Sequence, residues 1–322
     1  MTVLALDRYD RHFPFFDGTV ALPSGLDLKV LQVGQEATLR DGTGRHKRML
    51  NGGEFDAAET SLSSYVVAKS KGLPFTAIPV FPRRLFSQGQ IFVNADAGVR
   101  SPADLAGRTV GLQSFQTTLA VLAKGDLAAD HGVALTSIKW RLHHADTLET
   151  KNTRKFDIAT LPSGTDLGTA LAKGEIDALF FSRTPKTKDG TQDRIRRLFD
   201  DSRAAEENYV LEHGYWPIMH IIALREEAVA SNPKLPVQLM QAFADASRIA
   251  AGYLIDPNWS QIVWAKYALD QERKAFGRSL WTSGVAANRA NLERFVSYSF
   301  DQGLTDRRVS VEELFHPSVR ET

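Results

Sequence analysis

The chain has 322 residues, enough for roughly two domains of ~150 residues, and its 43% hydrophobic content is that of an ordinary globular protein. Its 39 Lys and Arg residues nearly balance its 38 Asp and Glu residues, which argues against the basic face that nucleic-acid binding requires. The lack of cysteine excludes disulfides, thiol nucleophiles and cysteine-ligated metals. With no secretory signal and no apolar stretch of about 20 residues, we expect a cytoplasmic protein without a membrane partner.

Apolar runs bounded by turn residues predict strands and helices that alternate along the chain. We expect strands at residues 3–6, 26–33, 55–59, 75–81, 90–93, 109–112, 139–143, 176–181 and 218–224. We expect helices at residues 61–71, 117–129 and 164–173, and a mostly helical stretch from 232 to about 300. The charged segment 37–50 is interrupted by glycine and is assigned no element. This alternation predicts an α/β protein with largely parallel strand pairing.

The common motifs for phosphate, dinucleotide and metal chemistry are missing from the sequence. It contains no GxxxxGK[ST] loop, no GxGxxG after a strand, no HExxH and no GxSxG. Its eight histidines are scattered rather than arranged at the spacing of metal ligands. We therefore expect no metal site.

Polar residues cluster after several of the expected strands. The carboxyl ends of strands are where α/β proteins bind ligands, so these clusters supply the candidate binding residues. In chain order they are Tyr9 and Asp10, then Glu59, Ser61, Ser63, Ser64 and Tyr65, then Arg83 and Arg84, and finally Gln113, Ser114, Phe115 and Thr117.

Each cluster also has a purely structural interpretation. The hydroxyl-rich turn at residues 59–65 opens a helix whose free N–H groups attract anions, but Ser61 could equally be an ordinary N-cap. Arg83 and Arg84 could bind a carboxylate through two parallel hydrogen bonds, or they could form a solvated surface pair. Phe115 could stack on a ring, or its turn could be an ordinary capped loop. The residues alone leave these alternatives open.

His220 lies at an aromatic-rich entry to a strand, in segment 215–220, which begins with Tyr215. A histidine in such a place is commonly a core residue held by hydrogen bonds. The functional alternative is a general acid that works near neutral pH.

Blocks of this sequence resemble known proteins. SPADLAGRTVG at residues 101–111 and AKGEIDA at residues 172–178 resemble the type II periplasmic binding protein fold. More specific blocks resemble the 4,5-dihydroxyphthalate decarboxylase family, namely FDAAETSLSSY at 55–65, AIPVFP at 77–82, YWPIMH at 215–220 and GVAAN at 284–288. The likeness extends in blocks over most of the chain.

The fold resemblance implies two α/β lobes that close over a small ligand. Lobe one would comprise residues 1–93 and 215–322, and lobe two residues 94–214. The ligand would lie in the cleft between the lobes and contact strand ends of both, which agrees with the positions of the polar clusters.

The family resemblance implies loss of CO2 from a hydroxylated aromatic dicarboxylate without a cofactor, so that the partner is a small aromatic carboxylate. It assigns the carboxylate to Arg83 or Arg84, proton donation to His220, and the orientation or deprotonation of a hydroxyl to Glu59. The other residues expected to contact the substrate are Tyr9, Ser61, Ser63, Ser64, Gln113, Ser114, Phe115, Thr117 and Tyr215. Association into a homo-oligomer is left open.

One stretch departs from the family pattern. Where the family has an Arg-His pair after the VFP block, this chain has Ser87 and Gln88. The departure favours a second hypothesis, a solute-binding protein that holds an aromatic carboxylate without reacting, whereas the missing export signal favours the enzyme. A ligand-sensing domain fits less well, because the chain leaves no room for a DNA-binding module.

Overall fold

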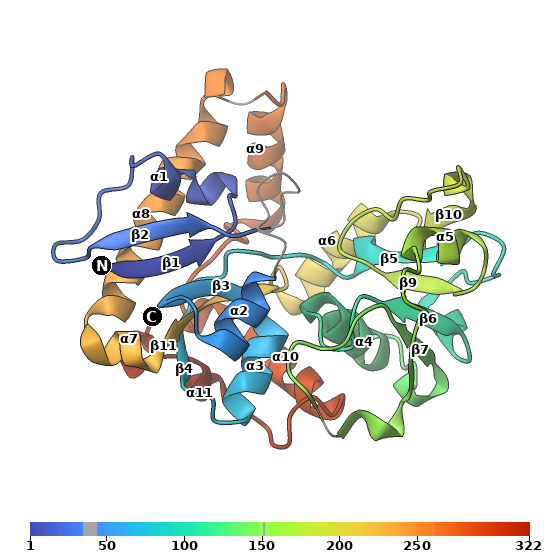
Figure 1. The fold of residues 1–322 in the computed structure, drawn as a ribbon. Coiled ribbons are helices and arrows are strands. Elements are labelled where there is room, and N and C mark those ends of the chain that lie inside the picture. The colour runs from blue at the N-terminus through green and yellow to red at the C-terminus, as the bar shows by residue number, and fades with distance from the viewer. Residues whose placement is uncertain (35–43, 151, 260) are drawn as a thin grey trace.

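Two β-sheets with helices packed around them form the framework of the molecule (Figure 1). The computed structural model describes residues 1–322 apart from residues 35–43, 151 and 260. The first sheet has the strand order β2-β1-β3-β11-β4, and the second has the order β10-β5-β9-β6-β7-β8. This arrangement confirms the α/β class that the alternation of strands and helices predicts.

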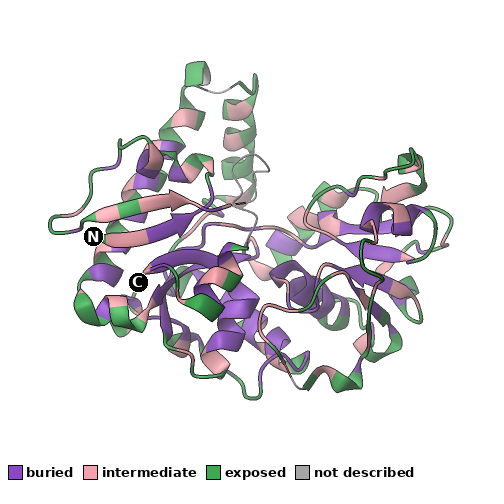
Figure 2. Ribbon diagram, viewed as in Figure 1, coloured by how far each residue is buried: buried purple, intermediate pink, exposed green. Residues whose placement is uncertain are grey.

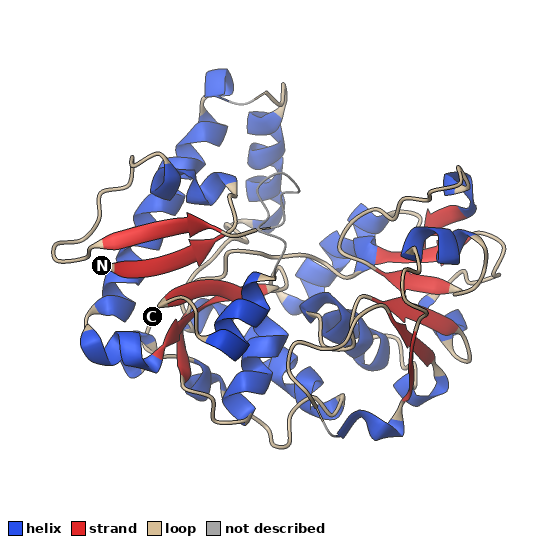
Figure 3. Cartoon of the chain, in the orientation of Figure 1, coloured by secondary structure: helices blue, strands red, loops and turns tan. Residues whose placement is uncertain are grey.

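The expected strands are present with slightly shifted bounds, but helices or strands also form at residues 13–16, 45–52, 157–160, 195–197 and 202–213, where the sequence predicts no element. Figure 3 shows how helices and strands are distributed along the chain. The first sheet contains β1 (Thr2–Leu6), β2 (Leu28–Gln32), β3 (Ala57–Ser61), β4 (Phe75–Ile78) and β11 (His220–Arg225). The second contains β5 (Ile91–Asn94), β6 (Thr109–Leu112), β7 (Lys139–Leu142), β8 (Asp157–Thr160), β9 (Ala178–Phe180) and β10 (Ile195–Arg197). The α-helices are α1 (Phe13–Phe16), α2 (Arg45–Gly52), α3 (Leu62–Ser70), α4 (Thr118–Ala129), α5 (Leu167–Ala172), α6 (Ser202–His213), α7 (Glu226–Ser231), α8 (Leu235–Ile255), α9 (Ala265–Phe276), α10 (Arg289–Asp301) and α11 (Val311–Leu314). No helix in the described ranges is long and apolar enough to cross a bilayer.

Strand pairing is mixed, so the expectation of largely parallel pairing is only partly right. β1 pairs in parallel with β2 and β3, and β7 lies in parallel between β6 and β8, while β6 also pairs in parallel with β9. β11 instead runs antiparallel to both β3 and β4, and β5 runs antiparallel to β9 and β10. β10 and β11 are far along the chain from the strands with which they pair. They are therefore not joined to those strands by the short strand–helix–strand crossover that makes neighbouring strands parallel.

The sheets suggest where the chain passes between the lobes. β5 pairs within the second sheet, whereas β4 pairs within the first. We infer that the first lobe boundary precedes Ile91 rather than following residue 93. β11 returns to the first sheet shortly after residue 214, where the second boundary is predicted.

Alternation along β11 builds separate cores on the two faces of the first sheet. β3 and β11, in the middle of this sheet, are buried along nearly all their length (Figure 2). Ile221 and Ala223 face one core, which takes in α3 and continues to α4 and α10. Ile222 and Leu224 face the other core, which α8 covers.

Helix α10 packs on both α3 and α4 and so links the two halves of the molecule. Gly125 of α4 permits this close approach, because a Cβ atom there would lie 2.0 Å from the Tyr298 ring of α10. The neighbouring Asp126 accepts hydrogen bonds from Ser87 at 2.7 Å and from Tyr298 at 3.2 Å. The contact between α4 and α10 therefore positions the second sheet relative to the first.

Candidate active site

A cavity of about 370 Å³ lies between the two sheets. Its walls come from the end of β3, the start of β11, the turn before α4 and the loops after β7 and β9, so both sheets contribute. A cavity of this size suits a small organic ligand. Of the predicted site residues, the lining contains Ser61, Ser64, Arg83, Gln113, Ser114, Thr117 and His220. The other polar lining residues, which are not among the predicted site residues, are His46, Gln116, Thr118, His144, Thr147 and Ser182.

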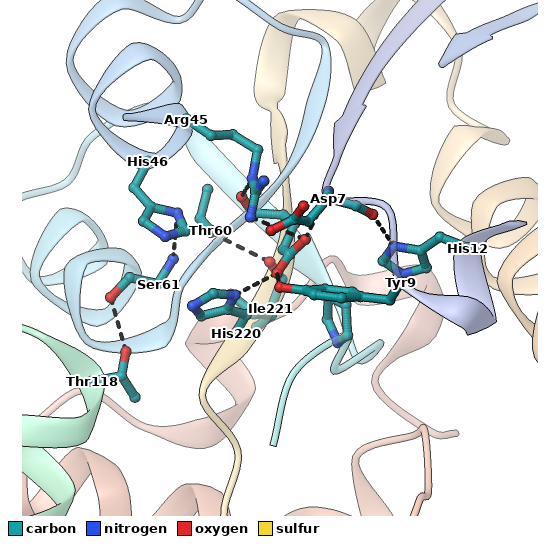
Figure 4. A network of polar contacts seen from close by, with 12 residues as sticks. Asp7, Tyr9, His12, Arg45, His46, Thr60, Ser61, Thr118, His220 and Ile221 are labelled. Carbon is teal, nitrogen blue, oxygen red and sulfur yellow. Dashed lines mark hydrogen bonds and ion pairs between the residues drawn. The ribbon is translucent and has the colours of Figure 1, made fainter. Parts of the chain in front are cut away.

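Glu59 lies at the centre of a buried polar network at the end of β3. Figure 4 labels its partners Tyr9, Arg45 and His220. β3 and β11 pair with Ser61 opposite His220, so Glu59 and His220 are diagonal neighbours on one face of the sheet. Nδ1 of His220 accordingly contacts Oε1 of Glu59. The Tyr9 hydroxyl donates to the same oxygen at 3.1 Å, and the Asp7 N–H donates to Oε2 at 3.2 Å.

Arg45, at the start of α2, supplies the opposite charge. Its Nη2 lies 3.0 Å from Oε2 of Glu59, and its Nε donates to the Glu59 backbone carbonyl at 2.8 Å. Burial raises the pKa of Glu59, but Arg45 and His220 outweigh it and hold that pKa well below its usual range. Glu59 is therefore ionised, fully buried and absent from the cavity lining. The prediction that Glu59 contacts a substrate hydroxyl is therefore corrected, because its side chain lies behind His220 and does not reach the cavity.

The ionised Glu59 fixes the tautomer of His220. A carboxylate can only accept hydrogen bonds, so Nδ1 of His220 carries the proton and Nε2 is the nitrogen left for the cavity. Burial lowers the pKa of His220, although Glu59 acts in the opposite direction. His220 is therefore neutral at neutral pH, and its Nε2 is a hydrogen-bond acceptor.

His46 presents the opposite hydrogen-bonding character to the cavity. The backbone N–H of Ser61 donates to its Nδ1 at 3.0 Å, so the proton of a neutral His46 is on Nε2. Burial and the neighbouring His220 hold the pKa of His46 well below its usual value. The two rings are 4.9 Å apart and nearly perpendicular. The cavity thus receives one imidazole acceptor and one imidazole donor.

Arg45 and His46 are missing from the predicted site because the sequence of segment 37–50 predicts no helix. Residues 37–43 of that segment lie outside the described part of the chain, but α2 begins directly after Gly44. A signal was present, since Arg45 and Met49 lie four residues apart and both are buried, with Leu50 beside them. That spacing is typical of the inner face of a helix.

The serine-rich start of α3 both caps the helix and joins the two sheets. Ser61 is the N-cap of α3, and its hydroxyl also pairs with that of Thr118 at 2.9 Å. The Ser64 hydroxyl donates to Oε1 of Gln116 at 3.1 Å. Ser63 donates to the backbone carbonyl of Gln116 and lies outside the cavity lining. The prediction that Ser63 contacts a ligand is therefore corrected, because its hydroxyl is used within the protein.

The structure separates the two neighbouring arginines. Arg83 lines the cavity. Arg84 is buried elsewhere and donates to the backbone carbonyls of Trp216 and Thr282 and, at 2.6 Å, to Oδ1 of Asn288. Burial lowers the pKa of Arg84 to about 9. Arg84 thus holds the segments around Trp216, Thr282 and Asn288 together, and Arg83 is the arginine that can contact a carboxylate in the cavity.

The aromatic residues among the predicted contacts also lie outside the lining. Tyr9 instead joins the network behind the cavity, where its hydroxyl donates to Glu59. Phe115 is 1% exposed and packs 5.5 Å from the Phe156 ring, while Tyr215 packs 5.9 Å from the Tyr209 ring. Burial of their large apolar surfaces draws these rings into cores, so stacking of Phe115 or Tyr215 on a ligand is not supported.

The departure at Ser87 and Gln88 also falls outside the cavity lining. Both residues are buried, and the Ser87 hydroxyl bonds to Asp126 of α4. The two residues that stand at the departure therefore form no part of the cavity wall in this chain.

One group of side chains outside the cavity has the spacing of a metal site. Ligand atoms of Asp130, Glu212 and His213 lie within 4.8 Å of one another. Arg294, however, binds both carboxylate oxygens of Asp130, with a distance of 2.6 Å to Oδ2. The bound guanidinium competes with any cation at this group.

Two α/β sheets with a ligand-sized cavity between them define a protein of the type II periplasmic binding protein fold. The alkanesulfonate-binding protein SsuA from Xanthomonas axonopodis, solved with bound MOPS, matches 98% of this chain and 96% of its own at a TM-score of 0.57 and 14% identity. The aliphatic sulphonate-binding protein SsuA from Escherichia coli matches 100% and 93% at a TM-score of 0.53 and 11% identity. At such identities the likeness shows the fold alone.

Within that fold, the chain belongs to the 4,5-dihydroxyphthalate decarboxylase family. A 4,5-dihydroxyphthalate decarboxylase from Comamonas testosteroni is 30% identical over 99% of this chain and 97% of its own. A protein of the same name from Pseudomonas putida is 29% identical over 64% of this chain and 80% of its own. Residues 24–161 also match the family described as NMT1/THI5 like.

Proposed function

We propose that this protein is an enzyme that removes one carboxylate, as CO2, from a dihydroxylated phthalate-type acid without a cofactor. One observation carries the proposal: His220, held by the ionised Glu59, presents its second nitrogen to a cavity that Arg83 also lines. The names of the two curated relatives support the same class of reaction.

The chemistry needs a proton and an electron-rich ring rather than a redox group. A ring hydroxyl para to the leaving carboxylate pushes electron density toward the carbon that bears it. A C–H bond forms at that carbon, the bond to the carboxylate breaks, and its electron pair restores the aromatic ring as CO2 leaves. The protein therefore has to hold the dianion, orient the hydroxyl and supply one proton.

Arg83 is the residue proposed to hold a carboxylate. Its guanidinium can bind both oxygens through parallel hydrogen bonds, which fixes the plane of the group as well as its position. Leu85 and Met219 line the cavity nearby and supply apolar wall beside this charge. Limited water in such a site strengthens the ion pair.

His220 is the proposed proton donor. The negative charge of the bound substrate raises its pKa, so the ring takes up a proton on Nε2 when the substrate binds. Glu59 stabilises the resulting imidazolium through Nδ1–H, as the carboxylate does in a Ser-His-Asp triad. A positioned acid contributes about 10²–10⁴-fold, so the remaining acceleration comes from positioning and electrostatics.

His46 is proposed to act on the ring hydroxyl. Its Nε2–H can donate to the hydroxyl oxygen and favour the ionised form that pushes electrons into the ring. His46 stays neutral in this arrangement, because a second positive charge 4.9 Å from a protonated His220 is disfavoured. The two histidines would thus serve opposite ends of one substrate.

Binding without reaction is the second candidate function. The observation that favours it is the fold, which this chain shares with the sulfonate-binding proteins. The Ser87–Gln88 departure from the family pattern also favours it, although neither side chain lines the cavity in this chain.

Release of CO2 from a matched set of acids separates the two functions. The enzyme is expected to release CO2 from 4,5-dihydroxyphthalate but not from phthalate, which lacks the electron-donating hydroxyls, or from 3,4-dihydroxybenzoate, which lacks the second carboxylate. Calorimetry on the same acids gives their affinities. Binding of 4,5-dihydroxyphthalate with no CO2 released would contradict the enzyme and favour the solute-binding protein.

A further inference from the structure

The C-terminal end of α8 and helix α9 form an arm that projects from the first sheet, away from the rest of the chain (Figure 1). The two helices pack against each other along the arm. None of the residues that line the cavity comes from α8 or α9. The arm therefore has no part in the proposed reaction, and its features need another explanation.

The end of the arm exposes large apolar side chains. We define the arm patch as Ile255, Trp259, Val263, Trp264 and Tyr267, each of which is between 50% and 80% exposed. Single exposed apolar residues are ordinary, but large side chains gathered on one projecting element mark an interaction site. Water-exposed tryptophans at this density are unfavourable unless something covers them.

Helix α9 gives a second, independent reason to expect a covering surface. It has 12 residues, and none of them is buried within the chain. An isolated helix of about 12–15 residues is marginal in water, because most helical stability in proteins comes from packing one face. The chain itself buries little of α9, so a partner surface is needed to stabilise it.

We propose that the arm patch is an interface at which two copies of this chain associate about a two-fold axis. The exposed apolar area of the patch is on the order of 600 Å² per chain, from side chains that bury ~150–250 Å² each when aromatic. A symmetric pair would bury about twice that area, which reaches the ~1,200 Å² at which specific, stable interfaces begin. Such self-complementary pairing is the commonest form of soluble oligomer.

The charges of the arm favour a protein surface over a lipid surface. Asp256, Asp270 and Glu272 balance Lys266, Arg273 and Lys274, and Lys266 is paired with Asp270 at 3.1 Å. Association with an anionic membrane would need an excess of Lys and Arg beside the apolar residues. The arm has no such excess.

Sedimentation velocity of the full chain over a wide range of concentration tests the proposal. We expect the wild type to reach twice the 35.6 kDa of one chain. Trp264→Glu should weaken association by at least about thirtyfold, as expected for a central interface tryptophan. Leu211→Glu is the matched control, because Leu211 is 73% exposed on α6, outside the arm patch, and its replacement should leave the mass unchanged.

Several results would overturn the proposal. A wild type that stays at the mass of one chain at every concentration would do so, as would equal dissociation by both variants. Sedimentation of a monomeric wild type with phosphatidylcholine–phosphatidylserine vesicles would show that the arm binds lipid instead. Circular dichroism should report wild-type helix content for Leu211→Glu. For Trp264→Glu it should report a loss no larger than α9, because that helix loses its covering surface. Catalytic activity should be retained in both variants.

Discussion

The rings of His46 and His220 lie 4.9 Å apart and cross at 73°, yet they face the cavity with opposite hydrogen-bonding character. The Ser61 N–H holds Nδ1 of His46, which leaves Nε2–H as a donor. Glu59 holds Nδ1–H of His220, which leaves Nε2 as an acceptor. Burial lowers the pKa of both rings, and that of His46 is lowered further by His220. Substitution of one histidine therefore removes either the donor of His46 or the acceptor of His220 and leaves the other in place.

Replacement of His220 should separate chemistry from binding. His220→Gln removes the proton donor but keeps a polar side chain of similar reach, so kcat should fall about 10²–10⁴-fold while substrate affinity changes little. Steady-state kinetics and calorimetry measure the two effects. His144→Gln is the control, because His144 lines the same cavity without contacting Glu59. Undiminished turnover in the His220 variant would refute its role as the acid.

The two neighbouring arginines should respond to substitution in different ways. Arg83→Met should raise KM strongly, by the loss of a charge-assisted contact of about 1.5–3 kcal/mol, and leave Tm unchanged. Arg84→Met should lower Tm instead, because it strands Asn288 and two backbone carbonyls inside the protein. Thermal melts and kinetics of both variants check this division. A raised KM in the Arg84 variant alone would reverse the assignment.

The buried pair of Glu59 and Arg45 should matter for stability as well as for activity. Glu59→Gln leaves the Arg45 guanidinium buried without its counter-charge, so the free energy of unfolding should fall by about 3–5 kcal/mol. The double variant Glu59→Gln/Arg45→Met removes both charges and should recover much of that stability. Its kcat should stay low, because His220 still lacks a carboxylate. Urea unfolding and kinetics of the three proteins provide the test, and a double variant with wild-type kcat would contradict it.

The pH dependence of the reaction should reveal the charge on His220. Its pKa is lowered in the empty site, so the acid form is lost as the pH rises through a value below the usual 6.5. kcat/KM, which reports the free enzyme, should therefore fall with rising pH from that value. The bound dianion raises the pKa again, so kcat should persist to higher pH. Coincident profiles for kcat and kcat/KM would contradict this account.

Asp126 should make stability depend on pH in the opposite sense to an ordinary salt-bridged carboxylate. Burial raises its pKa to about 7, above the unfolded value of about 3.9. Its contribution to stability is therefore fully present below that unfolded value and is lost as the pH rises through about 7. Asp126→Asn should make the free energy of unfolding less dependent on pH in this window. Urea unfolding on either side of pH 7 measures the difference, and parallel curves for the variant and the wild type would exclude the effect.

The strand-to-helix turn at β3 shows what the sequence could predict. Glu59 and Ser61 are polar residues at the end of an apolar strand, and Ser61 is followed by a helical pattern, so both the turn and its cap could be inferred. The loop before α4, which contains Thr117, could be inferred in the same way. These local rules identified several residues of the cavity wall.

Other features depend on distances that local rules cannot supply. Arg83 and Arg84 have identical chemistry, and only the tertiary structure decides which one reaches the cavity. His46 lies in a segment whose glycines are typical of a loop, and its partner Ser61 follows fifteen residues later. The hydrogen bond from Ser61 that sets its tautomer appears only when α2 packs beside β3.

Proton NMR of 4,5-dihydroxyphthalate mixed with the protein in D2O tests the central claim most directly. We predict that the signal of the two equivalent ring protons gives way to 3,4-dihydroxybenzoate deuterated at the carbon that lost its carboxylate. His220→Gln should slow this conversion about 10²–10⁴-fold. Substrate signals that broaden on binding but never convert, with the wild-type protein, would contradict the enzyme and leave a protein that only binds its ligand.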